Sequence, residues 1–328
     1  MKKLFSLLAM LTAIVLTAGA QSIQVATLSH DGTITSYTSA DALRRAYEAA
    51  VDGDVITLSS GVFNSVGLEK RITLRGAGMG VKLNDTDPYI EPTIIKGGFK
   101  IKADGSPENC LRMEGVLCPD RVYFYGLINS QFSKCKFMDI DYSAGYGGFT
   151  DVTFINCVFE SGSFCYNASM NFYGCYFNNI YFNANSIYTL TNCIYTVEND
   201  GRPGPECVLK NTIVIGANRD NWVSSCSQAY YTVCVGNLSA HCDLYKSLQQ
   251  NNGTLLPADT QLFKEGTFYQ LNDEAKKYLG SDGTEVGIYG GSLPFDPTPT
   301  NPQIVKFNVA PKTTADGKLS IDIEVNAK

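Results

Sequence analysis

Two aspartates two positions apart form a close pair of carboxyl groups that could do acid–base chemistry. Asp139 and Asp141 stand in the stretch "DIDY", and on an extended strand they would project from one face about 7 Å apart. Glycoside hydrolysis needs two carboxyl groups, one acting as an acid and the other as a base or nucleophile. The simpler interpretation is a solvated turn after Phe137, because nothing in the sequence gives the two groups different surroundings.

A second candidate site is the segment 216–231, which concentrates aromatic, charged and amide side chains. It holds the only tryptophan of the chain, and its candidate residues are Arg219, Asp220, Trp222, Tyr230 and Tyr231. Aromatic rings beside hydrogen-bonding groups are suited to carbohydrate binding, and a lyase needs a basic group such as Arg219 beside its substrate. The alternative is that Trp222 only packs over an enlarged loop.

The histidines and the late cysteines form no recognisable metal motif. Cys226, Cys234, His241 and Cys242 make a loose group, but their spacing matches none of the common zinc sites. His30 lies in the turn-like stretch "SHDGT", and both histidines are expected to be structural. We therefore predict no metal site.

The elements that must position these residues are indicated by a repeat. Cys135, Cys157, Cys175 and Cys193 follow one another at spacings of 22, 18 and 18 residues. Three positions before them stand Phe132, Phe154, Phe172 and Leu190, and two positions after them stand Phe137, Phe159, Phe177 and Tyr195. A unit of this length has room for about three short strands, which favours a parallel β-helix with ladders of like residues inside it.

The same register is expected to continue through Leu209 and Thr212 and then through Tyr231 and Cys234. In this interpretation the repeated cysteine is a small buried residue at a corner of each turn. Disulfide bonding is the alternative, because the chain has 11 cysteines. The odd count and the match to the repeat favour a ladder of unpaired thiols.

The N-terminal part adds a resemblance to a known family. Residues 39–51 have the apolar spacing of an amphipathic helix with Ser39 as its N-cap, and "GDVITLSSGVF" follows at 53–63. Together with "NCVF" at 156–159 and "NCIY" at 192–195, this arrangement resembles secreted right-handed parallel β-helix proteins of the pectin-lyase-like type. The resemblance implies an all-β solenoid with the helix capping its N-terminal end.

The resemblance also implies an activity that can be compared with the residues. The family includes polysaccharide lyases and glycoside hydrolases, with Asn-x-Asp, Asp-Asp, Gly-His-Gly and Arg-x-Lys blocks in its hydrolases and calcium in its lyases. This chain contains no Asp-Asp, no Gly-His-Gly and no Arg-x-Lys. We therefore expect no cofactor, with calcium implied only if the protein is a lyase.

Residues 1–20 have the pattern of a cleaved secretory signal peptide. Lys2 and Lys3 precede an apolar run, and Ala18-Gly19-Ala20 supplies the small residues of a cleavage site. No cysteine follows directly, so a secreted or periplasmic protein without a lipid anchor is expected. The chain has a net charge of −6, which becomes −8 without the two lysines. This balance argues against a nucleic-acid partner, and no later segment is apolar over the length of a transmembrane helix.

The C-terminal part is expected to differ from the repeats. We predict a β-helix over 21–292, with a short helix at 271–280 and a closing turn at 281–295. The four prolines of 293–302 predict a stiff linker that separates a strand pair at 303–328 from the solenoid.

The function favoured by the sequence is a secreted, non-catalytic protein that binds glycans or serves as a structural surface factor. The first alternative is a lyase or hydrolase of an acidic polysaccharide. The second is a scaffold that binds a protein partner through its C-terminal strands.

Overall fold

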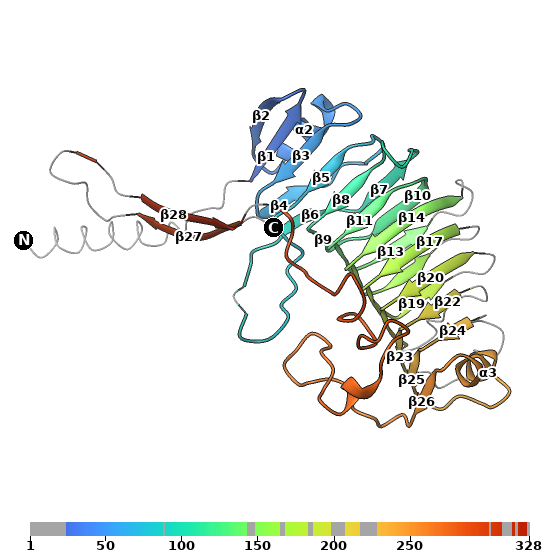
Figure 1. The fold of residues 1–328 in the computed structure, drawn as a ribbon. Coiled ribbons are helices and arrows are strands. Elements are labelled where there is room, and N and C mark those ends of the chain that lie inside the picture. Colours follow the sequence, from blue (N-terminus) through green and yellow to red (C-terminus); the bar gives the residue numbers. More distant parts are fainter. Residues whose placement is uncertain are drawn as a thin grey trace, which may run out of the picture.

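Each repeat of the sequence forms one turn of a parallel β-helix. The computed structural model describes residues 24–87, 89–142, 148–164, 168–182, 186–197, 207–216, 228–301, 303–309, 317–318 and 321–326. About nine turns stack on one another, and their strands form three sheets along the solenoid (Figure 1). The expected all-β solenoid is confirmed.

The three sheets differ in length, because some turns lack a third strand. In spatial order, sheet A has 11 strands: β2 (Thr33–Thr38), β1 (Val25–His30), β3 (Val55–Leu58), β5 (Thr73–Arg75), β8 (Arg112–Glu114), β11 (Gln131–Ser133), β14 (Phe149–Ile155), β17 (Ala168–Tyr173), β20 (Ile187–Thr191), β22 (Cys207–Lys210) and β24 (Gln228–Tyr230). Sheet B has ten: β4 (Gly61–Asn64), β6 (Thr93–Lys96), β9 (Val116–Cys118), β12 (Lys136–Phe137), β15 (Val158–Phe159), β18 (Tyr176–Asn178), β21 (Ile194–Thr196), β23 (Ile213–Ile215), β25 (Val233–Val235) and β26 (Thr254–Leu256). Sheet C has five: β7 (Phe99–Ala103), β10 (Val122–Leu127), β13 (Ile140–Tyr142), β16 (Gly162–Phe164) and β19 (Ile180–Phe182).

Stacked aromatic rings fill the middle of the solenoid. On sheet A, the Phe154 ring stacks on Phe132 at 4.9 Å and on Phe172 at 5.0 Å between ring centroids. On sheet B, Phe159 stacks in the same way on Phe137 and Phe177. These pairs are in register across the parallel strands. The predicted ladders are therefore confirmed.

The repeated cysteines lie at the corner where each turn passes from sheet A to sheet B. The residue before each cysteine has a φ between 51° and 59°, at Lys134, Asn156, Gly174 and Asn192. This left-handed conformation favours glycine and asparagine, which explains why Asn-Cys recurs in the sequence.

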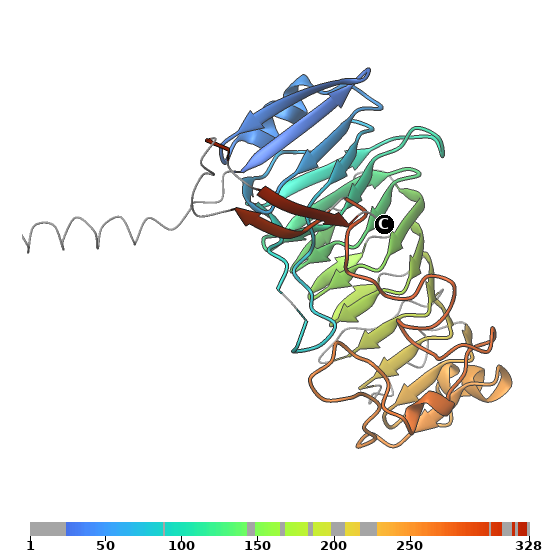
Figure 2. The same ribbon diagram turned by 60° about the vertical axis from the view of Figure 1, so that its left-hand side comes forward.

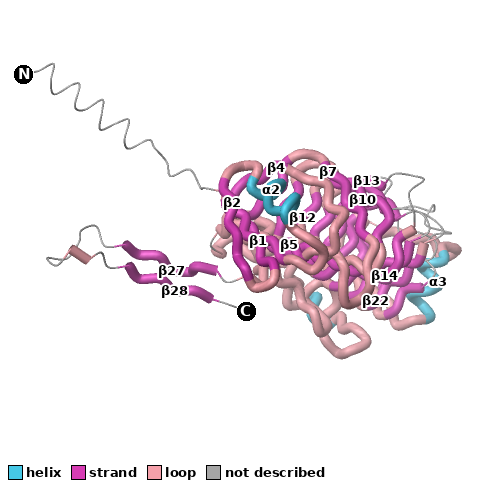
Figure 3. The backbone as a smooth tube through the Cα atoms, turned by 90° about the horizontal axis from the view of Figure 1, so that it is seen from above, coloured by secondary structure: helices cyan, strands magenta, loops and turns pink. Residues whose placement is uncertain are grey.

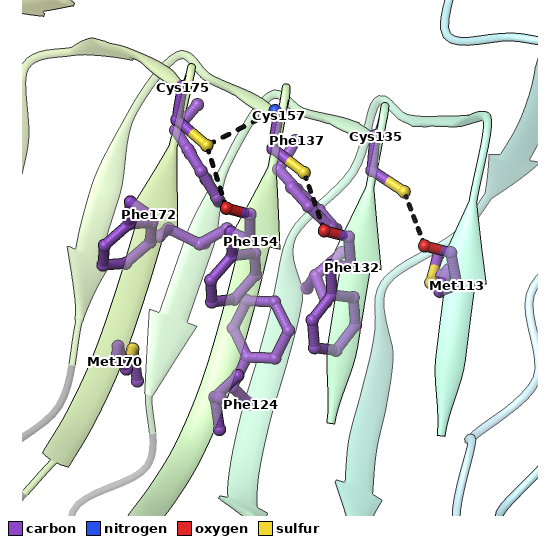
Figure 4. Packing of buried hydrophobic residues seen from close by; sticks show 14 of the residues in the cluster. Met113, Phe124, Phe132, Cys135, Phe137, Phe154, Cys157, Met170, Phe172 and Cys175 are labelled. Carbon is purple, nitrogen blue, oxygen red and sulfur yellow. Dashed lines mark hydrogen bonds between the residues drawn. The ribbon is translucent and has the colours of Figure 1, made fainter. Parts of the chain in front are cut away.

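The cysteine side chains point into the solenoid and are completely buried. Each donates a weak hydrogen bond to the preceding turn, as in Cys157 Sγ to Phe132 O (3.6 Å) and Cys175 Sγ to Phe154 O (3.5 Å) (Figure 4). None of the four ladder cysteines forms a disulfide. The prediction of a buried ladder of thiols is confirmed.

The predicted continuation of the register is only partly right. Leu209 pairs with Leu190, as expected, but the next residue of that ladder is Ala229 and not Tyr231. Cys234 pairs with Val214, so it belongs to the ladder that follows the corner and not to the cysteine ladder. The corner residue of this turn is Thr232, which lies 20 residues after the corner residue of the preceding turn. The sequence predicted a spacing of 22 residues, because the residue types at that spacing also match the repeat.

The two ends of the solenoid are built differently. Helix α2 (Ala42–Ala49) packs its buried Leu43, Ala46 and Tyr47 on the first strands, inside the predicted range 39–51. Ser39 does not cap it: the N-cap is Asp41, whose N–H is bonded to Ser39 Oγ. Beyond it, the antiparallel strands β1 and β2 extend sheet A, so the outermost strand at this end is β2.

At the other end, helix α3 (Asp243–Gln250) covers the last strand of sheet A. Its Leu244 and Leu248 belong to the solenoid core, and Ser247 Oγ accepts the N–H of Ala229. This helix was not predicted, and Cys242 is its N-cap residue, with His241 directly before it.

The predicted closing turn at 281–295 is wrong, because the strands of the solenoid end with β26. Residues 257–292, the side layer, instead cover the outer face of sheet B from β15 to β25 (Figure 2). The contact is apolar: Leu262, Val286 and Ile288 pack with outward side chains such as Ile194 and Ile213. The expected helix at 271–280 is a single 3-10 turn, η2 (Ala275–Lys277), preceded by Asn272, whose Oδ1 accepts the N–H of Ala275.

Residues 293–301, the return segment, run back along the turns towards the N-terminal end. Pro294 O accepts from Asn156 Nδ2, Thr298 O from Lys134 Nζ, and Asn301 Nδ2 donates to Gly76 O. Pro294, Pro297 and Pro299 therefore lie along the solenoid and do not form a linker that leads away from it. Strands β27 (Gln303–Val309) and β28 (Ile321–Asn326) then form an antiparallel hairpin that projects away from the solenoid near its N-terminal end (Figures 1 and 3).

Candidate polysaccharide-binding face

The outer face of sheet C carries a continuous row of polar and aromatic side chains. Side chains alternate along each strand: Val122, Phe124 and Ile140 point into the core, and their neighbours on the same strand point outwards. The parallel register then aligns the outward residues of successive turns, which form the sheet C row: Lys100, Tyr123, Asp141, Ser163 and Tyr181, flanked by Lys102 and Tyr125.

Two tyrosines of the row lie side by side on β10, next to the lysines of β7. The rings of Tyr123 and Tyr125 have centroids 6.3 Å apart, and the Nζ of Lys100 lies 5.1 Å from the centroid of the Tyr125 ring. Both tyrosines are partly exposed and both lysines are exposed. Partly exposed rings held in place by neighbours present flat apolar surface beside hydrogen-bonding groups.

The predicted carboxyl pair consists of Asp141, a member of this row, and Asp139, just before β13, and both contact one arginine. Arg121 Nε is 2.6 Å from Asp139 Oδ2, and Arg121 Nη1 is 3.4 Å from Asp141 Oδ2. The hydrogen bond with Asp139 is the main cause that raises the pKa of Arg121. Sequence reasoning did not identify Arg121, which lies 18 residues before Asp139 and one turn away in the solenoid.

This arrangement does not provide an acid and a base with different surroundings. The side chains of Asp139 and Asp141 are 30% and 33% exposed and share the same guanidinium. Glycosidases instead give their two carboxyl groups contrasting environments, so that one stays protonated. The same ion cluster is a poor fit for calcium, because a cation already occupies the position between the carboxylates.

The predicted tyrosines of the second candidate site lie on another part of the molecule. Tyr230 ends β24 of sheet A, where its hydroxyl donates to Gln228 Oε1, and Tyr231 occupies the left-handed corner with φ 47°. The turn that holds Asp141 is five strands of sheet A away, about 24 Å along the solenoid. The structure therefore does not bring Tyr230 and Tyr231 together with Asp139 and Asp141.

Arg219, Asp220 and Trp222 lie outside the described residues, in the connection between β23 and β24, and so does Cys226. Across the described part of the chain, no group of three or more His, Cys, Asp or Glu side chains is arranged to hold a metal ion.

His30 has a structural partner that the sequence did not suggest. Its Nδ1 is 2.8 Å from Oδ1 of the buried Asp54, and Asp54 Oδ2 accepts the N–H of Val51. This hydrogen bond is the largest cause that raises the pKa of His30, followed by the charges of Asp54 and Asp31. The pair joins β1 to the loop before β3, so its role is in the N-terminal end of the fold.

Comparison with known proteins gives no relative for this chain. No protein-family model, no curated protein and no solved structure matches it. Within the described ranges, neither helix has the length and apolarity needed to cross a membrane.

Proposed function

We propose that this protein is exported and binds an extended polysaccharide along the outer face of sheet C without cleaving it. The observation that carries the proposal is the sheet C row, to which each turn contributes an outward side chain, such as Tyr123 or Asp141. The resemblance to pectin-lyase-like right-handed β-helix proteins and the signal-peptide pattern at residues 1–20 support the same assignment.

The spacing of the row suits a polymer better than a single sugar. Neighbouring strands are about 4.8 Å apart, which is close to the rise of one residue in an extended β-linked polysaccharide. A chain lying parallel to the solenoid axis would therefore meet one side chain of the row per sugar. Tyr123 and Tyr181 stand three strands apart in this row, so they would stack on separate sugars, with Asp141 and Ser163 between them.

Binding without cleavage follows from the charges beside the row. Arg121 forms ion pairs with both carboxylates, whose side chains are similarly exposed, and the sequence lacks the Asp-Asp, Gly-His-Gly and Arg-x-Lys blocks. A lyase or hydrolase remains the first alternative, and it would need catalytic groups other than this pair. Because Asp139 and Asp141 do not fit calcium, no step of that alternative is assigned to the metal.

A glycan array followed by calorimetry with the best oligosaccharide tests the proposal. We expect Tyr123→Ala to weaken binding at least about tenfold, or about 1.4 kcal/mol. The matched control is Tyr230→Ala, which removes a partly exposed tyrosine from sheet A and should leave the affinity unchanged. Loss of binding in Tyr230→Ala or Trp222→Ala alone would move the site to segment 216–231. Absence of any glycan ligand would reject the proposal.

A second candidate function is a scaffold that attaches to a protein partner through its C-terminal hairpin. The supporting observation is that β27 and β28 pair only with each other among the described strands, although two strands alone are marginally stable. A pull-down that depends on residues 303–328 would support it, and glycan binding by the protein lacking these residues would separate it from the first proposal.

A further inference from the structure

The outermost strand of sheet A has an edge that no described strand covers. β2 pairs with β1 on one side only. Its sequence, Thr-Ile-Thr-Ser-Tyr-Thr, has no charge and no proline, which are the features that usually prevent edge strands from pairing with other chains. Ile34 in this strand is 71% exposed, more than any other large apolar residue of the described chain.

We propose that β2 pairs edge to edge with β2 of a second copy of this chain, in antiparallel orientation across a two-fold axis. The pairing joins two 11-stranded sheets at their N-terminal ends, where Figure 1 shows β2 as the last strand of the stack. The main-chain groups of the edge gain partners, and Ile34 of each copy comes to lie on the same face of the joined sheet.

The other end of sheet A cannot continue such an assembly. There the edge strand β24 is covered by α3, with Ser247 Oγ accepting the N–H of Ala229 and Leu248 buried in the core. Sheet A therefore has one open edge and one covered edge. Both copies must use the same open edge, so the contact is isologous, and assembly stops at two copies and does not form a filament.

Charges at the two ends of β2 complement each other in an antiparallel pair. Asp31 precedes the strand and its side chain is 92% exposed, while the Cζ of Arg45 lies 5.3 Å from the centroid of the Tyr37 ring near the other end. Antiparallel pairing brings Asp31 of one copy towards Arg45 of the other, and the two-fold axis produces this contact twice. Because β2 itself carries no charged residue, pairing two copies of it adds no repulsion between like charges.

The size of the contact predicts a weak dimer. A pair of six-residue strands buries less than the roughly 1,200 Å² of an ordinary stable interface, so the dimer should form as concentration increases. The association is independent of glycan binding, because sheet C lies on a different face of the solenoid from the edge of β2.

Sedimentation velocity of the mature chain over a concentration series tests the proposal. We expect reversible dimerisation that Ile34→Lys weakens at least tenfold, while the control Ile187→Lys, at an isoleucine 56% exposed in the middle of sheet A, leaves it unchanged. Asp31→Lys or Arg45→Glu alone should also weaken the dimer, and the double variant should restore it. A monomer up to about 1 mM, or a dimer unaffected by Ile34→Lys and by either charge reversal, would overturn the proposal.

Discussion

The thiol of Cys193 and the hydroxyl of Thr212 occupy the same corner of successive turns and make the same contact. Cys193 Sγ donates to Phe172 O at 3.5 Å, and Thr212 Oγ1 donates to Leu190 O at 3.0 Å. Both residues are completely buried. The corner therefore needs a small side chain that can donate to the preceding turn, and cysteine and threonine both meet this need.

Substitutions at Cys193 should show how much the hydrogen-bond donor at the corner contributes to the free energy of unfolding. Cys193→Thr keeps a donor and should change the free energy of unfolding by less than about 1 kcal/mol, whereas Cys193→Ala leaves a small void and removes the hydrogen bond, at a cost of about 1–2 kcal/mol. Urea unfolding of both variants measures the difference. Equal stability of the two variants would show that the hydrogen bond contributes nothing.

The ladder thiols should not react in the native protein. Burial raises the pKa of Cys135, Cys157 and Cys175 well above that of a free thiol, and the reactive thiolate is therefore both scarce and inaccessible. Mass spectrometry after labelling at about pH 8 should find these cysteines unmodified, and fully modified after denaturation. Rapid native labelling of any of the three would contradict the buried ladder.

The sequence was sufficient for the repeat, the ladders and the cysteine corner because these depend on residue types that recur at one position. It was not sufficient for the side layer. The outward residues Val158, Ile194 and Ile213 are apolar, so their strands of sheet B are buried on both faces and need a cover. In the sequence, the apolar residues on both faces of these short strands could have predicted such a covering layer. Val286 and Ile288, which lie in the predicted closing turn at 281–295, provide the cover instead.

The contact of His30 with Asp54 predicts a pH-dependent stability. Because the pKa of His30 is raised in the folded protein, the charged imidazole favours folding. This contribution is complete below the ordinary pKa of about 6.5 and is lost as the pH rises through the raised value. The melting temperature should therefore differ more between the unmodified protein and His30→Gln at about pH 5.5 than at about pH 8.5. His241→Gln is the control. A difference that does not change with pH, or that grows towards pH 8.5, would refute the linkage.

Truncation should show that the return segment belongs to the solenoid and the hairpin does not. Removing residues 303–328 should leave the melting temperature nearly unchanged. Removing 294–328 should lower it by about 5 °C or more, since contacts such as Asn301 with Gly76 and Thr300 with Glu114 are lost. The sequence alone predicted residues 293–302 to be a linker that leads away from the solenoid, so that both truncations would have the same small effect. Equal melting temperatures for the two truncations would support that simpler view.

The candidate site was only partly visible in the sequence, because its residues come from different turns. Asp139 and Asp141 were recognised as a pair, but Arg121, which forms ion pairs with both, comes from the preceding turn. Tyr123 and Tyr125 could be placed outside only once the alternation of "VYFYG" was assigned to a strand with Val122 and Phe124 inside. Strand register, and not spacing along the chain, aligns these residues with Lys100 and Asp141.

The most direct test of the central claim is to incubate the protein with pectin, alginate and glycosaminoglycans, with and without calcium, and to measure bound and cleaved polysaccharide in the same samples. Unsaturated ends are followed by absorbance, and new reducing ends are measured chemically. The account predicts retention of at least one polysaccharide, weakened in Tyr123→Ala, with no new ends of either kind. Turnover that disappears in the Asp139→Ala/Asp141→Ala variant, or in Arg219→Ala, would contradict it and establish a hydrolase or a lyase, respectively.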